Sequence, residues 1–383
     1  MTDLGKNNNS SLQSAICAAL IMAIGMGFGR FAFTAVYPHM IDEGIFNLQH
    51  ASLAASANYA GYLFGALFAI RLKSQQSYLG SIVATVGTVV CLILLAYINT
   101  INLIILIRGL AGIFSAFAMV SASLWLLEQQ RQTHQAPILY AGVGLGIALS
   151  AELLFFGTHL GWHSKILWLL LGISSLVLGC ISMFGLSRAQ PNAISAQNTF
   201  NTNRKIPHAY ALIIIYALAG FGYIITATYL PLLVKNVLPN IDAAQIWAIF
   251  GLGAIPSCFF WHRIHQNFGT QIALSSNLGL QAFGVVLPII LPTTLGYLLS
   301  AFLVGATFMG TVTIAMPIAQ RIARQTQNNL IALMTVVYGI GQIIGPMVSN
   351  ALFSIHHTFN SSLLTACIAL LLATAISLES DLI

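Results

Sequence analysis

Long hydrophobic stretches dominate the chain, and polar residues gather in short segments between them. A helix that rises 1.5 Å per residue needs about 20 residues to cross a hydrocarbon core of about 30 Å, which is the length these stretches reach. They do not alternate apolar and polar positions as the strands of a membrane β-barrel do. The pattern therefore predicts twelve membrane-spanning helices, at residues 12–40, 51–71, 78–98, 101–127, 136–160, 164–187, 208–235, 243–262, 269–291, 293–320, 329–354 and 361–379.

One polar segment is longer than the others. Residues 188–206, RAQPNAISAQNTFNTNRKI, are poor in apolar residues and rich in Asn, Ser and Thr, which is typical of a flexible linker. We expect a cytoplasmic linker here, between an N-terminal six-helix bundle at residues 1–187 and a C-terminal six-helix bundle at residues 207–383. The fold class predicted is an all-α integral membrane protein.

Composition supports the membrane assignment. Hydrophobic residues make up 58% of the chain and charged residues only 6%, so the chain cannot cover a soluble surface. If the N-terminus lies in the cytoplasm, ten basic residues fall on the cytoplasmic side and two, Lys165 and Lys235, fall outside. Such an excess of basic residues on the cytoplasmic side is typical of membrane proteins, so we expect an inner-membrane protein with both termini in the cytoplasm. The formal charge of +6 then reflects topology, and nucleic-acid binding is not expected. The ten residues inside are Lys6, Arg71, Lys73, Arg131, Arg188, Arg204, Lys205, Arg263, Arg321 and Arg324.

The two halves of the chain repeat each other. Gly-Phe-Gly-Arg at 27–30 matches Gly-Phe-Gly-Tyr at 220–223, and Gly-Val-Gly at 142–144 matches Gly-Ile-Gly at 339–341, at nearly the same offset. An even number of helices in each half makes this a parallel repeat with its axis along the membrane normal. Such repeats are typical of transporters whose substrate path lies between the halves.

Three ionisable residues lie deep within apolar stretches: Arg30, Arg108 and Glu152. A charge in the membrane is costly unless it is paired or faces water, so each is a candidate functional residue. Helix rise places the three at similar depth in the N-terminal half. The C-terminal half has no deep charge, and Tyr223 stands at the position that repeats Arg30.

Several segments make the chain resemble the major facilitator superfamily, and its YbfB/YjiJ branch in particular. Arg-Gly-Leu-Ala-Gly at 108–112 is similar to an R-x-x-x-G motif of that superfamily, and the branch is indicated by GFGRFAFTAVYPHM, SANYAGYLFGAL, PSCFFWHRI and FLVGATFMGTV. The resemblance implies that the first and fourth helices of each half line the cavity, and that Arg108 takes part in proton coupling. The chain departs from the superfamily in two places. The loop at 69–74 lacks the usual Asp, and Ala148-Leu149 replaces the Gly-Pro of the antiporter signature.

We therefore expect Arg30 and Arg108 to bind an anionic substrate, because a guanidinium group binds carboxylate or phosphate bidentately. Glu152 would carry the proton, together with Arg108. The alternative is that the three residues form a buried ion network that only holds helices together. Further hydrogen bonds to substrate are expected from Asn58, Tyr59, Tyr223 and Gln342, although Asn and Gln also join membrane helices to each other.

The function expected is secondary active transport of a small organic, carboxylate-bearing solute by proton-coupled alternating access. Efflux of amphipathic drugs or sugars and a non-transporting receptor are the alternatives. An ATP-driven pump is not expected because the chain has no G-x-x-x-x-G-K-[ST] loop, and an enzyme is not expected because it has no H-E-x-x-H motif. We expect a monomer in the lipid bilayer, with a small-molecule substrate and protons as its partners, and neither cofactor nor metal.

Overall fold

All regular secondary structure in the described part of the protein is helical. The structure is a computed structural model, and the residues it describes are 2–69, 71–188, 209–237, 242–326 and 330–379. The predicted linker at residues 188–206 lies outside the described residues, apart from Arg188.

The first hydrophobic stretch forms one long helix with three parts. The α-helix α1 (Thr2–Met22) continues into a π-helical segment, η1 (Ala23–Phe31), and then into α2 (Phe33–Asp42). A π-helical turn has a wider repeat than an α-helix and often marks a functional position. The Gly-Phe-Gly-Arg motif lies in η1, with Arg30 in its last turn.

The remaining hydrophobic stretches form helices joined by short connections. In the N-terminal half they are α3 (Leu48–Ala69), α4 (Ser77–Tyr97), α5 (Ile101–Ser123) with its π-helical extension η3 (Leu124–Gln129), α6 (Ala136–His159) and α7 (Ser164–Arg188), with the short 3₁₀ turns η2 (Ser74–Gln76) and η4 (Thr133–Gln135). In the C-terminal half they are α8 (Ala209–Val237), α9 (Ala243–Ile290), α10 (Thr294–Thr326), α11 (Leu330–His356) and α12 (Asn360–Glu379).

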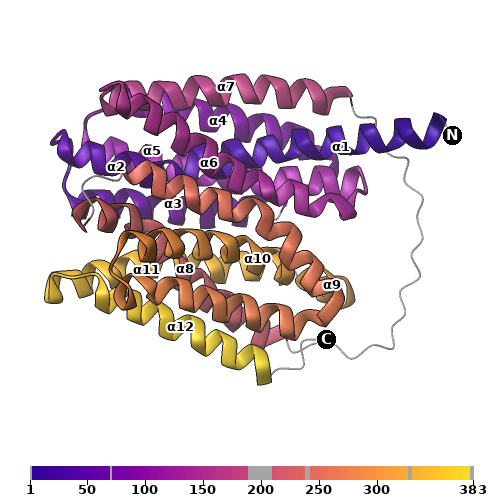
Figure 1. Ribbon diagram of the computed structural model, residues 1–383. Helices are drawn as coiled ribbons and strands as arrows, with labels where there is room; N and C mark the ends of the chain where they lie inside the picture. The colour runs from indigo at the N-terminus through magenta and orange to yellow at the C-terminus, as the bar shows by residue number, and fades with distance from the viewer. Residues whose placement is uncertain (1, 70, 189–208, 238–241, 327–329, 380–383) are drawn as a thin grey trace.

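Helix α9 reverses direction within its length. Gly269 has φ 82° and ψ 176°, a non-helical conformation with positive φ that glycine adopts without a steric penalty. Figure 1 shows α9 turning back on itself. The predicted boundary between residues 243–262 and 269–291 falls next to this glycine.

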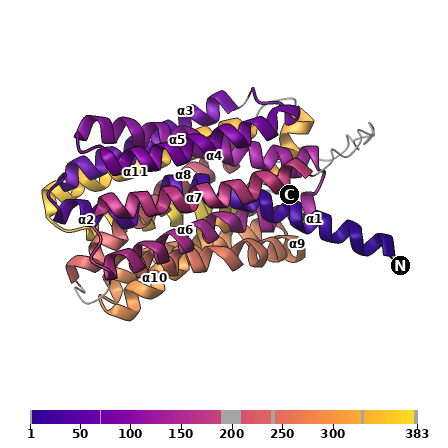
Figure 2. The same cartoon turned by 90° about the horizontal axis from the view of Figure 1, so that it is seen from above.

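The helices of the two halves lie on opposite sides of the molecule. In Figure 1 the helices coloured purple to magenta lie above and those coloured orange to yellow lie below, and Figures 1 and 2 both show them running along one common direction. The start of α1, the end of α12 and the bend of α9 share one end of the molecule (Figure 1).

The two ends of the molecule carry different charges. Arg71 and Arg131 follow α3 and η3, and Arg263 lies in α9 shortly before its bend at Gly269. We call this end of the molecule the basic end. Glu43 and Asp242 lie where helices end or begin at the opposite end, which we call the acidic end.

Ten helices among the described residues are long and apolar enough to cross a membrane. One of them is Ala244–Ile290, almost all of the bent helix α9, and α3 is not among the ten. The chain is thus a multi-pass helical membrane protein.

Small residues bring α3 and α5 into backbone contact next to the candidate site. A Cβ atom added at Gly61 would lie 1.9 Å from the carbonyl oxygen of Gly109, and one added at Gly112 would lie 2.0 Å from the carbonyl oxygen of Asn58. Glycine at these positions therefore permits an approach that no other residue allows. The contact places the Asn58 side chain within hydrogen-bonding distance of the Arg108 backbone.

Candidate functional site

Arg108 on α5 holds the end of the π-helical segment in place. Its Nη1 donates to the carbonyl oxygen of Gly29 at 2.8 Å, and its Nη2 donates to the carbonyl oxygen of Arg30 at 2.9 Å. The guanidinium carbon lies 4.4 Å from the centre of the Phe33 ring, and the side chain is 1% exposed. Charge-assisted hydrogen bonds to backbone carbonyls and a ring face compensate part of the cost of burying this cation. Arg108 thus contacts the backbone that carries Arg30.

Arg30 is buried as deeply and has two donor nitrogens without a partner among the described residues, whereas Arg108 has one, its Nε. Nη2 of Arg30 donates to Oε1 of Gln342 on α11, in the other half of the chain. Its Nε and Nη1 have no hydrogen-bond partner in the described part of the protein, although the side chain is only 2% exposed. Aromatic rings cover the guanidinium, and the Tyr62 ring centre lies 4.0 Å from its central carbon. A buried cation with two unpaired donors is costly unless a ligand completes it.

A cavity of about 530 Å³ lies next to Arg30 and extends toward the basic end. This volume is within the range of about 300–1,000 Å³ that small-molecule sites occupy. Arg30 is the one Lys or Arg among the described residues that line it, and seven of the 26 lining residues are Phe or Tyr. The lining consists of Met26, Arg30, Phe31, Tyr62, Met119, Val120, Ser123, Leu124, Leu127, Glu128, His134, Ala136, Tyr140, Tyr216, Tyr223, His262, Gln266, Phe308, Met309, Val312, Thr313, Met316, Pro317, Thr335, Tyr338 and Gln342.

Gln342 connects Arg30 to the aromatic wall of the cavity. While its Oε1 accepts from Arg30, its Nε2 donates to the hydroxyl oxygen of Tyr223 on α8. The Tyr223 ring is stacked between Phe308, at 5.3 Å between ring centres, and Tyr338, at 5.6 Å. The three side chains Arg30, Gln342 and Tyr223 thus form one hydrogen-bonded chain across the two halves.

Toward the acidic end, hydroxyl groups of the two halves meet. Tyr59 Oη lies 3.0 Å from Thr228 Oγ1, and Ser52 Oγ lies 3.2 Å from Tyr229 Oη. Tyr37 Oη also donates to the carbonyl oxygen of Thr228 at 3.1 Å. We call these five residues the hydroxyl seal. All of them are buried, so the halves are in contact beyond Arg30 while the cavity lies on its other side.

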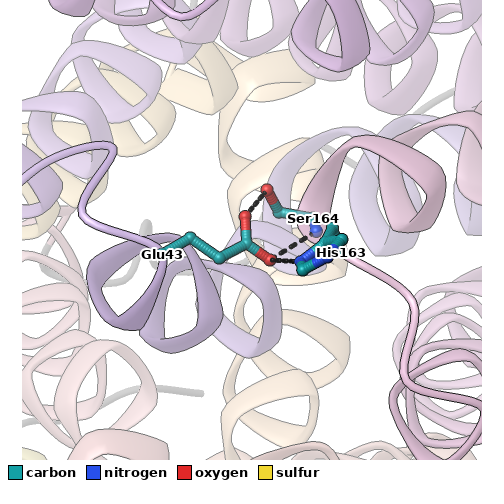
Figure 3. Close-up of polar contacts among 3 residues, drawn as sticks. All are labelled: Glu43, His163 and Ser164. Carbon is teal, nitrogen blue, oxygen red and sulfur yellow. Dashed lines mark hydrogen bonds and ion pairs between the residues drawn. The ribbon is translucent and has the colours of Figure 1, made fainter.

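Two acidic side chains strengthen the acidic end. Oδ2 of Asp242 accepts from Thr158 Oγ1 at 3.0 Å and thereby joins α9 to the end of α6. The Glu43 carboxylate accepts from the backbone N–H and the hydroxyl of Ser164, the first residue of α7, and lies 3.6 Å from His163 Nδ1 (Figure 3). A carboxylate at a helix N-terminus pairs with N–H groups that have no partner within the helix. Glu43 therefore fixes the end of the first long helix.

The structure distributes the predicted substrate ligands among three places. Arg30, Tyr223 and Gln342 line the cavity and lie together. Tyr59 covers the guanidinium of Arg30, with its ring centre 5.1 Å from the central carbon, and belongs to the hydroxyl seal. Asn58 and Arg108 are not among the lining residues, because the Asn58 amide donates to the Arg108 carbonyl at 2.9 Å and Arg108 donates to the π-helical backbone.

Glu152 does not join the two arginines. Its side chain is exposed, on the face of α6 that also carries the exposed Leu145 and Phe156. It has no hydrogen-bond or ion-pair partner among the described residues. The buried ion network of Arg30, Arg108 and Glu152 that was the alternative is therefore not formed in this conformation, since helix rise gives the depth of a residue and not the direction of its side chain.

Tyr62, Tyr140, Tyr216 and Tyr338 belong to the site but were not singled out from the sequence. Five of the chain's 12 tyrosines line the cavity, these four together with Tyr223. Tyr62, Tyr216 and Tyr338 lie within apolar stretches and not at their ends, which is a signal for them because interfacial tyrosines gather at helix ends. Tyr140 lies near the start of its stretch and carries no such signal.

Comparison with known proteins identifies the family. No curated protein matches the chain. The family described as "Uncharacterised MFS-type transporter YbfB" matches residues 22–378, from the last residue of α1 to the next-to-last residue of α12. The match covers the cavity, the hydroxyl seal and both buried arginines. The chain therefore belongs to the YbfB-type family of major facilitator superfamily transporters.

Proposed function

We propose that this transporter moves a small organic anion across the inner membrane and that Arg30 binds the negative group. The observation that carries the proposal is the buried guanidinium with unpaired Nε and Nη1 beside a cavity of about 530 Å³. A carboxylate supplies two acceptor oxygens in the plane that the donors of a guanidinium require. Binding an anion there also neutralises a charge that the apolar surroundings otherwise penalise.

The membrane topology proposed is twelve spans in two six-helix halves, residues 1–187 and 207–383. It follows from the ten candidate spans by dividing α9 at Gly269 and adding α3. The 47 residues of Ala244–Ile290 would extend about 70 Å if straight, more than twice the hydrocarbon core, so a reversal accounts for their length. The basic end then faces the cytoplasm, together with both termini.

Alternating access is the mechanism we propose. The cavity extends toward the basic end and the hydroxyl seal closes the acidic end, which is the arrangement of an inward-open state. Opening the seal while the basic ends of the halves approach each other would expose Arg30 to the outside. Such movement of one repeat against the other around a central site is the general mechanism of transporters with internal repeats.

Proton coupling is a further part of the proposal. Import of a monoanion against an inside-negative potential costs about 2.3 kcal/mol per 100 mV, and a proton carried with it removes that cost. Glu152 is the proposed proton carrier, although it is exposed in this conformation. We expect Glu152→Gln to abolish pH-driven uptake while leaving substrate affinity within about twofold. Unchanged uptake in this variant would remove Glu152 from the mechanism.

The direct test is thermal stability of the purified protein with carboxylates, a neutral sugar and a cationic dye, each at one acidic and one alkaline pH. We expect carboxylates to raise the melting temperature of the wild-type protein. Arg30→Gln should weaken their binding about ten- to hundredfold, the effect of losing a charge-assisted bidentate contact. Stabilisation by carboxylates that persists unchanged in Arg30→Gln would contradict the assignment.

One observation favours a second candidate, efflux of amphipathic drugs. Seven aromatic residues and four methionines line the cavity, and such a surface adapts to varied apolar molecules. In that case the cationic dye would stabilise the wild-type protein and Arg30→Gln equally, and carboxylates would stabilise neither.

A further inference from the structure

We infer that the substrate is an aromatic monocarboxylate, a planar ring that carries one carboxylate group. The inference rests on the proposed function and specifies the substrate class of the same site. It follows from the unpaired donors of Arg30, the absence of a second Lys or Arg from the described lining of the cavity, and the arrangement of the aromatic rings.

The donors of Arg30 select a carboxylate that approaches in the plane of the guanidinium. Rings of Tyr62, Tyr59 and Phe31 lie 4.0, 5.1 and 5.4 Å from its central carbon. These rings occupy positions around the guanidinium, and the unpaired Nε and Nη1 lie along its edges. The two edges of the guanidinium that can bind a carboxylate bidentately share Nη2, and Gln342 takes one of the two Nη2 hydrogens. One edge therefore keeps two donors for a carboxylate, either Nε with Nη2 or Nη1 with Nη2.

The number of cations in the lining favours one carboxylate over two. Among the lining residues that the structure describes, Arg30 is the one Lys or Arg, and the other guanidinium nearby, Arg108, is engaged by the carbonyls of Gly29 and Arg30. The two histidines of the lining, His134 and His262, lie toward the basic end of the cavity. Next to Arg30, a second carboxylate would lie against rings and methionines, where an unpaired charge costs several kcal/mol. A monoanion satisfies the site without that cost.

Aromatic rings arranged as a column adjoin the cation. Phe308, Tyr223 and Tyr338 are stacked, with interplanar angles of 14° and 19°, and Tyr216 continues the column at 4.5 Å from Tyr338. These four rings come from α8, α10 and α11 and line the cavity. Phe308 and Tyr338 already stack on Tyr223, so a ligand ring meets the column edge-to-face or at its ends. Such aromatic contacts contribute about 0.5–1.5 kcal/mol beyond the burial of area, so a planar ligand ring gains more here than an aliphatic one.

Gln342 sets the distance between the two parts of the site. Its amide alone separates the guanidinium of Arg30 from the hydroxyl of Tyr223. A ligand with its carboxylate on Arg30 therefore has its next atoms beside the ring column. A carboxylate attached directly to a ring fits this spacing.

The test compares four ligands of similar size by calorimetric titration of the full-length protein: benzoate, cyclohexanecarboxylate, benzamide and terephthalate. We expect benzoate to bind about three- to tenfold more tightly than cyclohexanecarboxylate, and benzamide and terephthalate to bind at least tenfold more weakly than benzoate. Equal affinity for benzoate and cyclohexanecarboxylate, or tighter binding of terephthalate, would overturn the inference and leave the anion transporter standing. Binding of none of the carboxylates would overturn the proposed function as well.

Two variants of Tyr223 separate the contribution of its ring to binding from that of its hydroxyl. Tyr223→Phe keeps the stacked ring and loses the hydrogen bond from Gln342, whereas Tyr223→Leu removes the ring. We expect the preference for benzoate over cyclohexanecarboxylate to persist in Tyr223→Phe and to fall to within about twofold of unity in Tyr223→Leu. A preference that survives in Tyr223→Leu would contradict the role of the column. Binding of cyclohexanecarboxylate by the same variant shows that the protein is folded.

Discussion

Arg30 and Arg108 are two guanidinium groups buried in the same apolar region, and they differ in what they donate to. Arg108 donates to two backbone carbonyls and lies against Phe33, and of its donor nitrogens only Nε has no partner among the described residues. Arg30 donates to Gln342 and has two unpaired donors. The first arrangement stabilises the protein, whereas the second costs free energy until a ligand binds, which is the usual exchange of stability for function at a binding site.

The same substitution at these two positions should therefore have different effects on thermal stability. Arg108→Gln leaves the carbonyls of Gly29 and Arg30 without their donors, at about 1–3 kcal/mol for each buried group, and should lower the melting temperature by several degrees. Arg30→Gln removes an incompletely paired charge and should leave the melting temperature equal or higher. Thermal unfolding of both variants without ligand checks this, and a larger loss in Arg30→Gln than in Arg108→Gln would contradict it.

At the scale of helices, the sequence predicted where each helix begins and ends better than it predicted the direction in which a side chain projects from the helix. The apolar stretches predicted the helices and the boundary near Gly269, where α9 reverses. The side of a helix on which a residue lies could not be predicted from the sequence, because the lipid-facing side of a membrane helix is as apolar as the side that packs in the protein core. Glu152 shares its exposed face with Leu145 and Phe156, so hydrophobicity gives no sign of that face.

The π-helical segment limited the prediction further. Residues in an α-helix are about 100° apart around the axis, so one extra residue in a turn rotates all that follow by that angle. Arg30 and the residues after it are thus displaced from the α-helical register. The repeat predicted that Tyr223 belongs to the site, but only the structure shows Gln342 between Tyr223 and Arg30.

The contact of α6 with α9 gives a prediction at this scale. A Cβ atom at Gly251 would lie 2.5 Å from the backbone nitrogen of Ala148, which cannot move aside without moving α6. We expect Gly251→Val to separate the halves and loosen the hydroxyl seal. In a cysteine-free background, Ser52→Cys should then react several-fold faster with a thiol reagent.

Gly279→Val is the matched control. A Cβ atom at Gly279 meets only a methyl carbon of Thr374, at 3.9 Å, so the same substitution leaves the contact between the halves intact. Equally fast labelling of Ser52→Cys in the Gly251→Val and Gly279→Val proteins would show that the contact of α6 with α9 does not control the hydroxyl seal.

For the whole molecule, the proposed inward-open state predicts the side from which the cavity is reached. Ser123 lines the cavity and Ser52 is buried in the hydroxyl seal. With a membrane-impermeant thiol reagent, Ser123→Cys should react in inside-out vesicles at least tenfold faster than in right-side-out vesicles. Ser52→Cys should react slowly in both. Fast labelling of Ser123→Cys from the outside would contradict the proposed orientation.

The central claim is that Arg30 binds the transported anion. Counterflow of labelled benzoate into proteoliposomes loaded with unlabelled benzoate tests it most directly, because this exchange requires a binding site that faces both sides in turn. The account predicts saturable counterflow with the wild-type protein and only background uptake with Arg30→Gln. Counterflow by Arg30→Gln at the wild-type rate and concentration dependence would contradict the claim.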